Sequence, residues 1–152
     1  MEQARTIGEL KRAGYEILPV REEMRRNLLA KLAAGTPILP GIVGYDDSVV
    51  PDIENAILAG HHIVFLGERG QGKSRIMRGL LDLLDAEIPA VAGCEINDDP
   101  FAPICNACRQ RAAAEGDALP IVWLPRERRY GEKLATPDVS MADLIGEIDP
   151  IK

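Results

Sequence analysis

The sequence is poor in several features that identify large classes of proteins. Aromatic residues make up 4% of its 152 residues, and there are only two histidines. No apolar run approaches the roughly 20 residues that a membrane-spanning helix needs, and the first fifteen residues have no apolar core of signal-peptide length. We therefore expect a cytoplasmic protein with no membrane partner. The apolar fraction of 46% is typical of one globular domain, or of part of one.

Basic charge is also scarce. The chain has 18 Lys and Arg against 24 Asp and Glu, which gives a net charge of −6. This balance argues against nucleic acid as a partner, because such binding depends on basic surfaces. Basic residues do cluster at Arg25 and Arg26 and at residues 126–129, but glutamates interrupt or border them. That pattern favours solvated faces of helices or loops, with a subunit contact as the alternative.

Residues 67–74 read Gly-Glu-Arg-Gly-Gln-Gly-Lys-Ser, the G-x-x-x-x-G-K-S pattern of a phosphate-binding loop. The glycines let the backbone N–H groups turn toward phosphate oxygens, and a helix beginning near Gly72 adds its positive end. Lys73 is suited to reach the β- and γ-phosphates, and the Ser74 hydroxyl to complete a Mg²⁺ shell. The pattern predicts a nucleotide site, and the residues expected to contact the phosphates are Gly67, Glu68, Arg69, Gly70, Gln71, Gly72, Lys73 and Ser74.

The flanking sequence has the strand and helix that this motif requires. Residues 63–66 are β-branched, aromatic or apolar and are bounded by glycines, which predicts a strand. After the loop, apolar residues from Ile76 to Leu84 recur on one helical face. Further short strands are predicted at residues 90–94 and 121–124, and a helix at residues 101–114.

The first forty residues predict two helices. Thr6 and Glu9 resemble a capping box, and an apolar stripe runs through the second helix at residues 21–34. Pro37 and Pro40 then bracket an extended connector. We therefore divide the chain into an N-terminal helical segment, residues 1–38, and an α/β nucleotide-binding region, residues 39–152.

Three stretches carry a resemblance to a known family. The stretches are GIVGYDDSVVPDIENAILAGHHIVFLGERGQGKS (residues 41–74), VAGCEINDDPFAP (residues 91–103) and EKLATPDVSMADLIGEIDPIK (residues 132–152). They are similar to the N-terminal part of the AAA+ ATPases related to the magnesium chelatase ATPase subunit. The resemblance implies ATP and Mg²⁺ as ligands and a parallel sheet with flanking helices. It also implies that the backbone around Ile42 and Val43 lies against the adenine, although those two residues also suit plain core packing.

The same resemblance implies a ring of identical subunits. In the family, this ring couples ATP hydrolysis to remodelling of a partner or to metal insertion, and the partner carries an integrin-like metal-binding domain. The alternative to this ATPase function is an interaction module that binds a partner, is stabilised by bound nucleotide and does not hydrolyse it.

Hydrolysis also needs an acidic pair at the end of a second apolar strand, which holds Mg²⁺ and orients the attacking water. Pro125 and Arg126 stand where those acids would follow residues 121–124. In the resembled family the acidic strand comes after the segment that matches residues 138–152. We therefore expect the sequence to stop before it, to bind ATP weakly at best and not to hydrolyse it alone. The retained strands would then lack their natural neighbours.

The sequence has three cysteines, an odd number, and no secretory signal. Together these features predict reduced thiols rather than disulfides. Cys94, Cys105 and Cys108 could provide three thiolate ligands for zinc, which usually takes four. Neither histidine is an obvious fourth ligand, and Asp98 or Asp99, expected in a turn, would be unusual. There are two alternatives to zinc. The cysteines could be small buried residues on one helical face, or two of them could form a redox pair.

Overall fold

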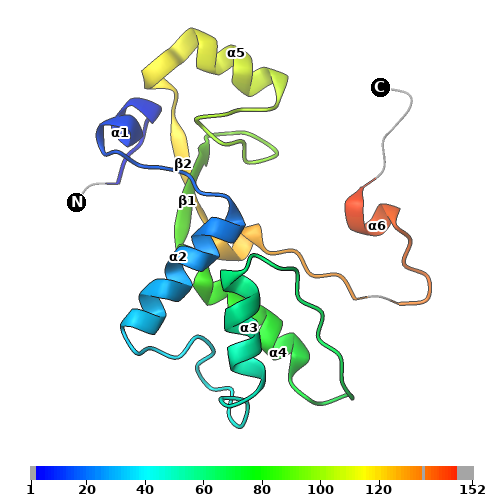
Figure 1. Ribbon diagram of the computed structural model, residues 1–152. Helices are drawn as coiled ribbons and strands as arrows, with labels where there is room; N and C mark the ends of the chain where they lie inside the picture. Colours follow the sequence, from blue (N-terminus) through cyan, green and yellow to red (C-terminus); the bar gives the residue numbers. More distant parts are fainter. Residues whose placement is uncertain (1–2, 135, 147–152) are drawn as a thin grey trace.

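The computed structural model describes residues 3–134 and 136–146 and has mixed helical and strand content (Figure 1). Each α-helix is short, and three 3₁₀ turns separate some of the elements. In chain order the elements are α1 (Ile7–Arg12), α2 (Val20–Ala33), α3 (Val49–Leu58), α4 (Lys73–Gly79), η1 (Leu80–Leu83), β1 (Glu87–Val91), α5 (Asn106–Glu115), η2 (Gly116–Ala118), β2 (Ile121–Pro125), η3 (Arg126–Arg129) and α6 (Ala142–Ile145). No helix among the described residues is long and apolar enough to span a lipid bilayer.

Helix α1 begins with the cap that the sequence predicts. The Thr6 side chain accepts a hydrogen bond from the Glu9 backbone N–H at 3.3 Å. The Glu9 carboxylate in turn accepts from the backbone N–H of Arg5 at 2.6 Å, one residue before the expected partner. Because α1 has only six residues, these bonds and its packing hold it in place rather than helix propensity alone.

The two strands form a sheet that is antiparallel, so the predicted parallel sheet is wrong for the described residues. Glu87 pairs with Pro125 and Val91 pairs with Ile121. The chain leaves β1 through a turn at Gly93, crosses α5 and returns in the opposite direction along β1. Antiparallel pairing then satisfies the backbone groups that the two strands turn toward each other, without a third strand between them. The first strand also lies three residues earlier than the predicted residues 90–94.

Residues 63–66 are not a strand, contrary to the prediction. They run without helix or strand assignment between α3 and the glycine-rich loop, and no described strand pairs with them. Val64 is 78% exposed and Leu66 is 89% exposed, whereas Ile63 and Phe65 pack against the core. The alternation typical of a strand is therefore present, but the backbone groups lack a neighbouring strand to pair with.

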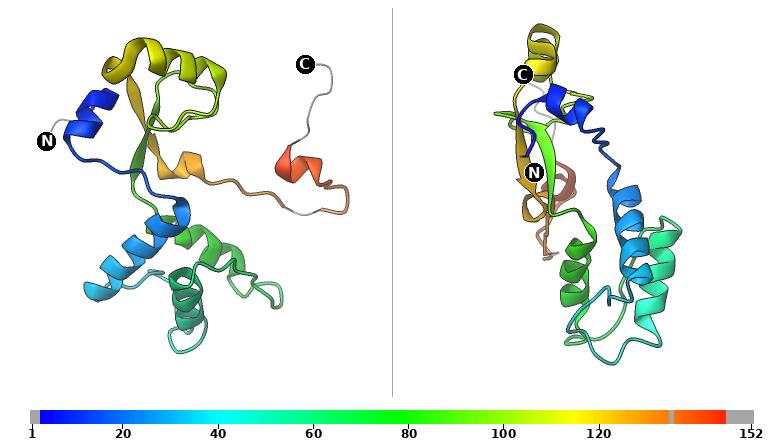
Figure 2. Two further views of the ribbon diagram at one scale, coloured as in Figure 1. Left: turned by 45° about the horizontal axis from the view of Figure 1, so that its top comes forward. Right: turned by 90° about the vertical axis from the view of Figure 1, so that its left-hand side faces the viewer.

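Two separate clusters of buried side chains form the interior. The first joins α2, α3, α4 and η1, and its buried members are Leu28, Ile38, Leu39, Ile53, Ile57, Ile76 and Leu83. The second joins α1, the sheet and α5, and its buried members are Ile7, Leu10, Val91, Cys108, Leu119 and Ile121. Figure 2 shows the two groups of elements at opposite ends of the sheet, with α6 at the end of an extended segment away from both.

The N-terminal helices contribute to different clusters. Helix α2 contacts α3 in the first cluster, whereas α1 packs on η2 in the second and Ile7 donates its backbone N–H to the Leu119 carbonyl. Trp123 of β2 reaches the same region, where its indole N–H donates to the carbonyl of Ala4 at 2.8 Å. The division of the chain near residue 38 stays a prediction.

A buried ion pair joins the first cluster to the end of the sheet. Glu23 of α2 is 2% exposed and accepts hydrogen bonds from both terminal nitrogens of Arg129, at 2.8 and 2.5 Å. The same carboxylate accepts from the backbone N–H of Asp85 at 2.7 Å. The expectation that residues 126–129 are a solvated basic face is therefore wrong for Arg129. Arg126 also turns inward, toward the backbone carbonyls of Leu81 in η1 and of Leu84 directly after it.

Candidate functional site

The glycine-rich loop makes a tight turn directly before α4. Gly70 has a φ of 86° and Gly72 a φ of 74°, values at which a side chain would be strained. Helix α4 starts at Lys73, so Ser74 lies in its first turn with an exposed side chain. The motif therefore lies between an extended segment and a helix, so the helix that it requires is present but the expected strand before it is not.

The side chains of Lys73 and Gln71 lie against the backbone of the loop itself. The Lys73 ammonium donates hydrogen bonds to the carbonyl oxygens of Gly67 at 2.7 Å and Glu68 at 2.5 Å. A Cβ atom on Gly67 would lie 2.1 Å from the side-chain oxygen of Gln71, so that position leaves no room for a larger residue while Gln71 keeps this rotamer. The ammonium group that would meet phosphate is thus held inside the loop by the loop's own carbonyls.

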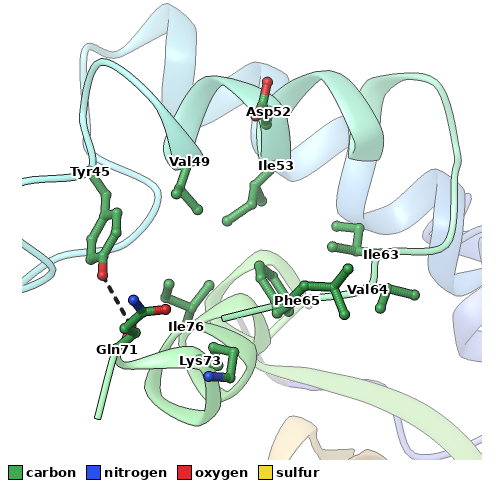
Figure 3. A pocket seen from close by; sticks show the side chains of 11 residues that line it. Tyr45, Val49, Asp52, Ile53, Ile63, Val64, Phe65, Gln71, Lys73 and Ile76 are labelled. Carbon is green, nitrogen blue, oxygen red and sulfur yellow. Dashed lines mark hydrogen bonds between the residues drawn. The ribbon is translucent and has the colours of Figure 1, made fainter. Parts of the chain in front are cut away.

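A pocket of about 290 Å³ opens beside the loop (Figure 3). Val49 and Ile53 of α3 face Phe65 and Ile76 across it, and Lys73 lies at its edge. The volume is just below the range of about 300 to 1,000 Å³ that is common for small-molecule pockets. The pocket is large enough to admit part of a nucleotide but does not enclose one.

Tyr45 closes one side of this pocket. Its hydroxyl donates a hydrogen bond to the backbone carbonyl of Gln71 at 3.2 Å (Figure 3). Its contact with the loop comes from residues 26 positions apart, which no local pattern indicates.

The two residues expected near the adenine differ in their surroundings. Ile42 is half-buried and packs against the first cluster, which fits the alternative of plain core packing. Val43 is 85% exposed. Neither residue lines the pocket beside the loop, so their assignment to adenine stays a prediction.

Helix α4 is also tied to the segment that follows η3. Arg78 donates two hydrogen bonds to the Glu132 carboxylate, at 2.9 and 2.8 Å, and the Tyr130 hydroxyl donates a third at 3.0 Å. The bonds from Arg78 first, and then from Tyr130, lower the pKa of Glu132 from 4.5 to about 2. Both members of the ion pair are partly exposed, so salt should weaken it.

This pair predicts a pH-dependent contribution to stability. A carboxylate with a depressed folded-state pKa stabilises the fold above its unfolded-state pKa, and the contribution is lost as the pH falls from about 4.5 toward about 2. In low salt, Glu132→Gln should therefore lower the thermal midpoint at pH 7 and flatten its decline across that acid range. The exposed Glu127→Gln is the matched control. Parallel curves for the Glu132→Gln variant and the unaltered chain would contradict the prediction.

The three cysteines converge around the start of α5. Cys105 caps this helix through its sulfur, which accepts from the Cys108 backbone N–H at 3.3 Å, and the Cys94 sulfur accepts from the Asp98 N–H at 3.4 Å. The ligand atoms of Cys94, Asp98, Cys105 and Cys108 all lie within 4.8 Å of one another. Asp98 is thus part of the cluster, although the sequence pattern favoured a simple turn there.

Burial and hydrogen bonding give the cluster members different acidities. Burial, followed by the neighbouring thiols, raises the pKa of Cys108 to about 12. Backbone N–H donors act in the opposite direction on two other members. The N–H of Asp98 is the main cause that lowers the pKa of Cys94. The N–H of Ile104 is the main cause that lowers the pKa of the Asp98 carboxyl. The three cysteines form no disulfide among the described residues, and Cys108 is buried; the expectation of reduced thiols stays a prediction.

Comparison with known proteins identifies relatives of the expected kind. The chain is 36% identical over 92 residues to the magnesium-chelatase subunit ChlI-1, chloroplastic, of Arabidopsis thaliana, an alignment that covers 57% of this chain and 21% of that protein. It is 37% identical over 98 residues to the corresponding ChlI subunit of Chlamydomonas reinhardtii, covering 60% and 22%. A ChlI homolog from Methanocaldococcus jannaschii is 41% identical over 49 residues, covering 32% and 13%.

These similarities confirm the resemblance to magnesium-chelatase subunits. The chain spans about a fifth of the length of the first two of these relatives. No protein-family model matches the chain, and no solved structure matches it. The similarity therefore indicates the general kind of protein, and the roles of individual residues depend on the geometry described above.

Proposed function

We propose that the chain is the ATP-binding part of a magnesium-chelatase-like AAA+ ATPase, which couples ATP hydrolysis to remodelling of a partner or to metal insertion. The position of Lys73 carries this proposal: its ammonium lies inside a glycine loop that has the phosphate-binding sequence, at the edge of a pocket. The similarity to magnesium-chelatase subunits supports it independently. A chance glycine turn would have no need of a lysine and a serine at these two positions.

Each part of the loop has a separate role in this function. The backbone N–H groups of residues 67–72 would surround the phosphates, with Lys73 on the β- and γ-phosphates and the exposed Ser74 hydroxyl on Mg²⁺. Bound ATP and Mg²⁺ would supply the phosphoryl group and the charge that neutralises it. The residues fit these ligands because Ser74 is accessible and positive φ angles are confined to glycines in the loop. Ile42 and Val43 would approach the adenine once the base is bound.

We expect weak binding and no turnover from this chain by itself. The two described strands end at Val91 and Pro125, and neither is followed directly by an acidic pair. The residues that the structure describes therefore include a group for the phosphates, but neither described strand places an acidic pair to orient an attacking water. A longer protein, with residues 39–152 as the first part of its nucleotide-binding domain and residues 1–38 as a helical extension, would provide the rest.

Assembly into a ring of identical subunits in the cytoplasm is part of the same proposal, as is a partner with an integrin-like metal-binding domain. The exposed Val64 and Leu66 support a contact surface beside the loop, since two large apolar side chains on an unpaired extended segment suit strand addition. The same observation favours the alternative function, an interaction module that nucleotide stabilises without hydrolysis.

Titration of the chain with a fluorescent ATP analogue tests the proposal. Binding should be stronger with Mg²⁺ than with EDTA, and unlabelled ATP should displace the analogue at least about tenfold better than AMP, because AMP lacks the phosphates that Lys73 would contact. Equal displacement by AMP and ATP would overturn the phosphate-binding role. Phosphate release above background that disappears in Lys73→Ala would instead overturn the absence of turnover.

A further inference from the structure

A second site, outside the glycine loop, has the composition and geometry of a metal centre. We propose that Cys94, Asp98, Cys105 and Cys108 bind one structural zinc ion, with three thiolates and one carboxylate oxygen as ligands. This site lies between the turn after β1 and the start of α5, in the second cluster, and does not depend on the proposed ATP function.

The distances suit a tetrahedral ion. The four ligand atoms lie within 4.8 Å of one another, whereas Zn–S bonds of about 2.3 Å in a tetrahedron place sulfur atoms about 3.8 Å apart. The donors therefore need to move inward by about 1 Å at most to close on the ion. Of the four residues, Asp98 and Cys108 are buried and Cys94 and Cys105 are half-buried, so the ion would be shielded from water.

The backbone already holds two of the sulfurs in a ligand-like arrangement. Cys94 accepts from the N–H of Asp98, and Cys105 accepts from the N–H of Cys108. A neutral thiol is a weak acceptor, but a thiolate accepts such bonds strongly, so these contacts would stabilise the zinc-bound form. Outer hydrogen bonds of this kind fix the direction of metal ligands.

Asp98 is the residue that completes the set. Its side chain is buried, and its two oxygens accept from the backbone N–H groups of Ile104 and Cys105, each at 3.0 Å. Each carboxylate oxygen has a second lone pair, so these bonds orient the group and still leave it free to bind an ion. A buried carboxylate is costly unless a cation or hydrogen bonds compensate it, and zinc would add the missing positive charge.

A nearby arginine could offset part of the remaining charge. Three thiolates and one carboxylate exceed the charge of Zn²⁺ by two. The Arg111 side chain lines the same pocket as the three cysteines and donates to the carbonyl of Ala92 at 2.8 Å. Its guanidinium also pairs with Glu115 at 3.1 Å, so it would offset at most one of the two excess charges.

The donor set favours a soft metal such as zinc over Mg²⁺ and Ca²⁺. Three sulfur ligands exclude Mg²⁺ and Ca²⁺, which require oxygen, and four closed positions are typical of a structural zinc rather than a catalytic one. A disulfide between any two cysteines would use only two of the four clustered donors and would leave the third thiol without a covalent partner. The ion would clamp residues 94–108 onto the sheet end and α5.

The test is metal content followed by cobalt substitution in the full chain. Purification without chelator should give one zinc per chain, and removing it should lower the thermal midpoint reported by Trp123 fluorescence, because Trp123 packs against the same cluster. Co²⁺ should then restore the midpoint and give a thiolate-to-cobalt charge-transfer band for three sulfurs.

The variant Asp98→Cys tests whether Asp98 is the fourth ligand. A fourth thiolate at this position should raise the charge-transfer intensity per cobalt by about a third, because the band grows with the number of sulfur ligands. The matched control Asp99→Cys adds a thiol one residue away and should leave the intensity unchanged. The proposal is overturned by less than about 0.2 zinc per chain in the unaltered protein, by a visible iron–sulfur spectrum, or by equal intensities for Asp98→Cys and the unaltered chain.

Discussion

Glu23→Ala is expected to lower the free energy of unfolding by about 3 to 5 kcal/mol, which is a large part of the stability of a domain of this size. The loss has two causes. Arg129, whose side chain is 9% exposed, would keep its charge without a partner. The backbone N–H of Asp85 would also lose its acceptor. Urea denaturation, followed by far-ultraviolet circular dichroism and by Trp123 fluorescence, measures the change.

The control for this experiment is the neighbouring Glu22→Ala. Glu22 is exposed in the same helical turn, so its replacement should change the unfolding free energy by no more than about 0.5 kcal/mol. The double change of Glu23→Leu with Arg129→Met should recover the part of the loss that comes from the unpaired Arg129 charge, but not the part that comes from the Asp85 N–H. A loss below about 1 kcal/mol for Glu23→Ala would show that the pair contributes little.

Lys73→Ala is expected to weaken MgATP binding by about 10- to 100-fold. A hydrogen bond from an ammonium to a charged phosphate contributes about 1.5 to 3 kcal/mol, and each 1.4 kcal/mol is a factor of ten in affinity. In the free chain the Lys73 ammonium bonds to the carbonyls of Gly67 and Glu68, and it must give up those bonds to contact phosphate. The net contribution to affinity is therefore smaller, and we expect a loss in the lower part of this 10- to 100-fold range. Competition with the fluorescent ATP analogue measures the change.

Arg69→Ala is the matched control for Lys73→Ala. It removes the same charge from an exposed position in the same loop, and the affinity should fall by less than about threefold. Both variants should keep the unfolding free energy of the unaltered chain within about 0.5 kcal/mol, because neither side chain is buried. Equal losses of affinity in the two variants would mean that general charge, rather than the position of Lys73, governs binding.

Local features of the fold could be read from the sequence. The Thr6 cap, helix α2 and the loop with its following helix depend on residues within a few positions of one another, and all three are present. The details of helix ends were harder to predict. The apolar face after the loop favoured one helix as far as Leu84, but α4 ends at Gly79 and a 3₁₀ turn buries Leu83 instead.

Contacts between distant residues could not be read in the same way. The direction of β2 along β1 depends on how α5 and its turns return the chain, which no periodicity encodes. Glu23 and Arg129 are 106 positions apart, and each looks like an ordinary surface charge in its own segment. Asp98 joins the cysteine cluster because the turn after Cys94 brings its carboxylate back toward the start of α5. These partners follow from the tertiary fold alone.

The presence of two buried clusters, described above, has a consequence for how the molecule unfolds. Each cluster has its own helices, and the connections between them include the sheet, the charged group at Glu23, Asp85 and Arg129, and the bonds of Arg126 to η1. Such a molecule behaves as two cooperative units whose coupling is set by a few contacts rather than by one continuous interior. Ligands that bind either unit would then protect that unit first, and they would protect the other only through the energy of those few contacts.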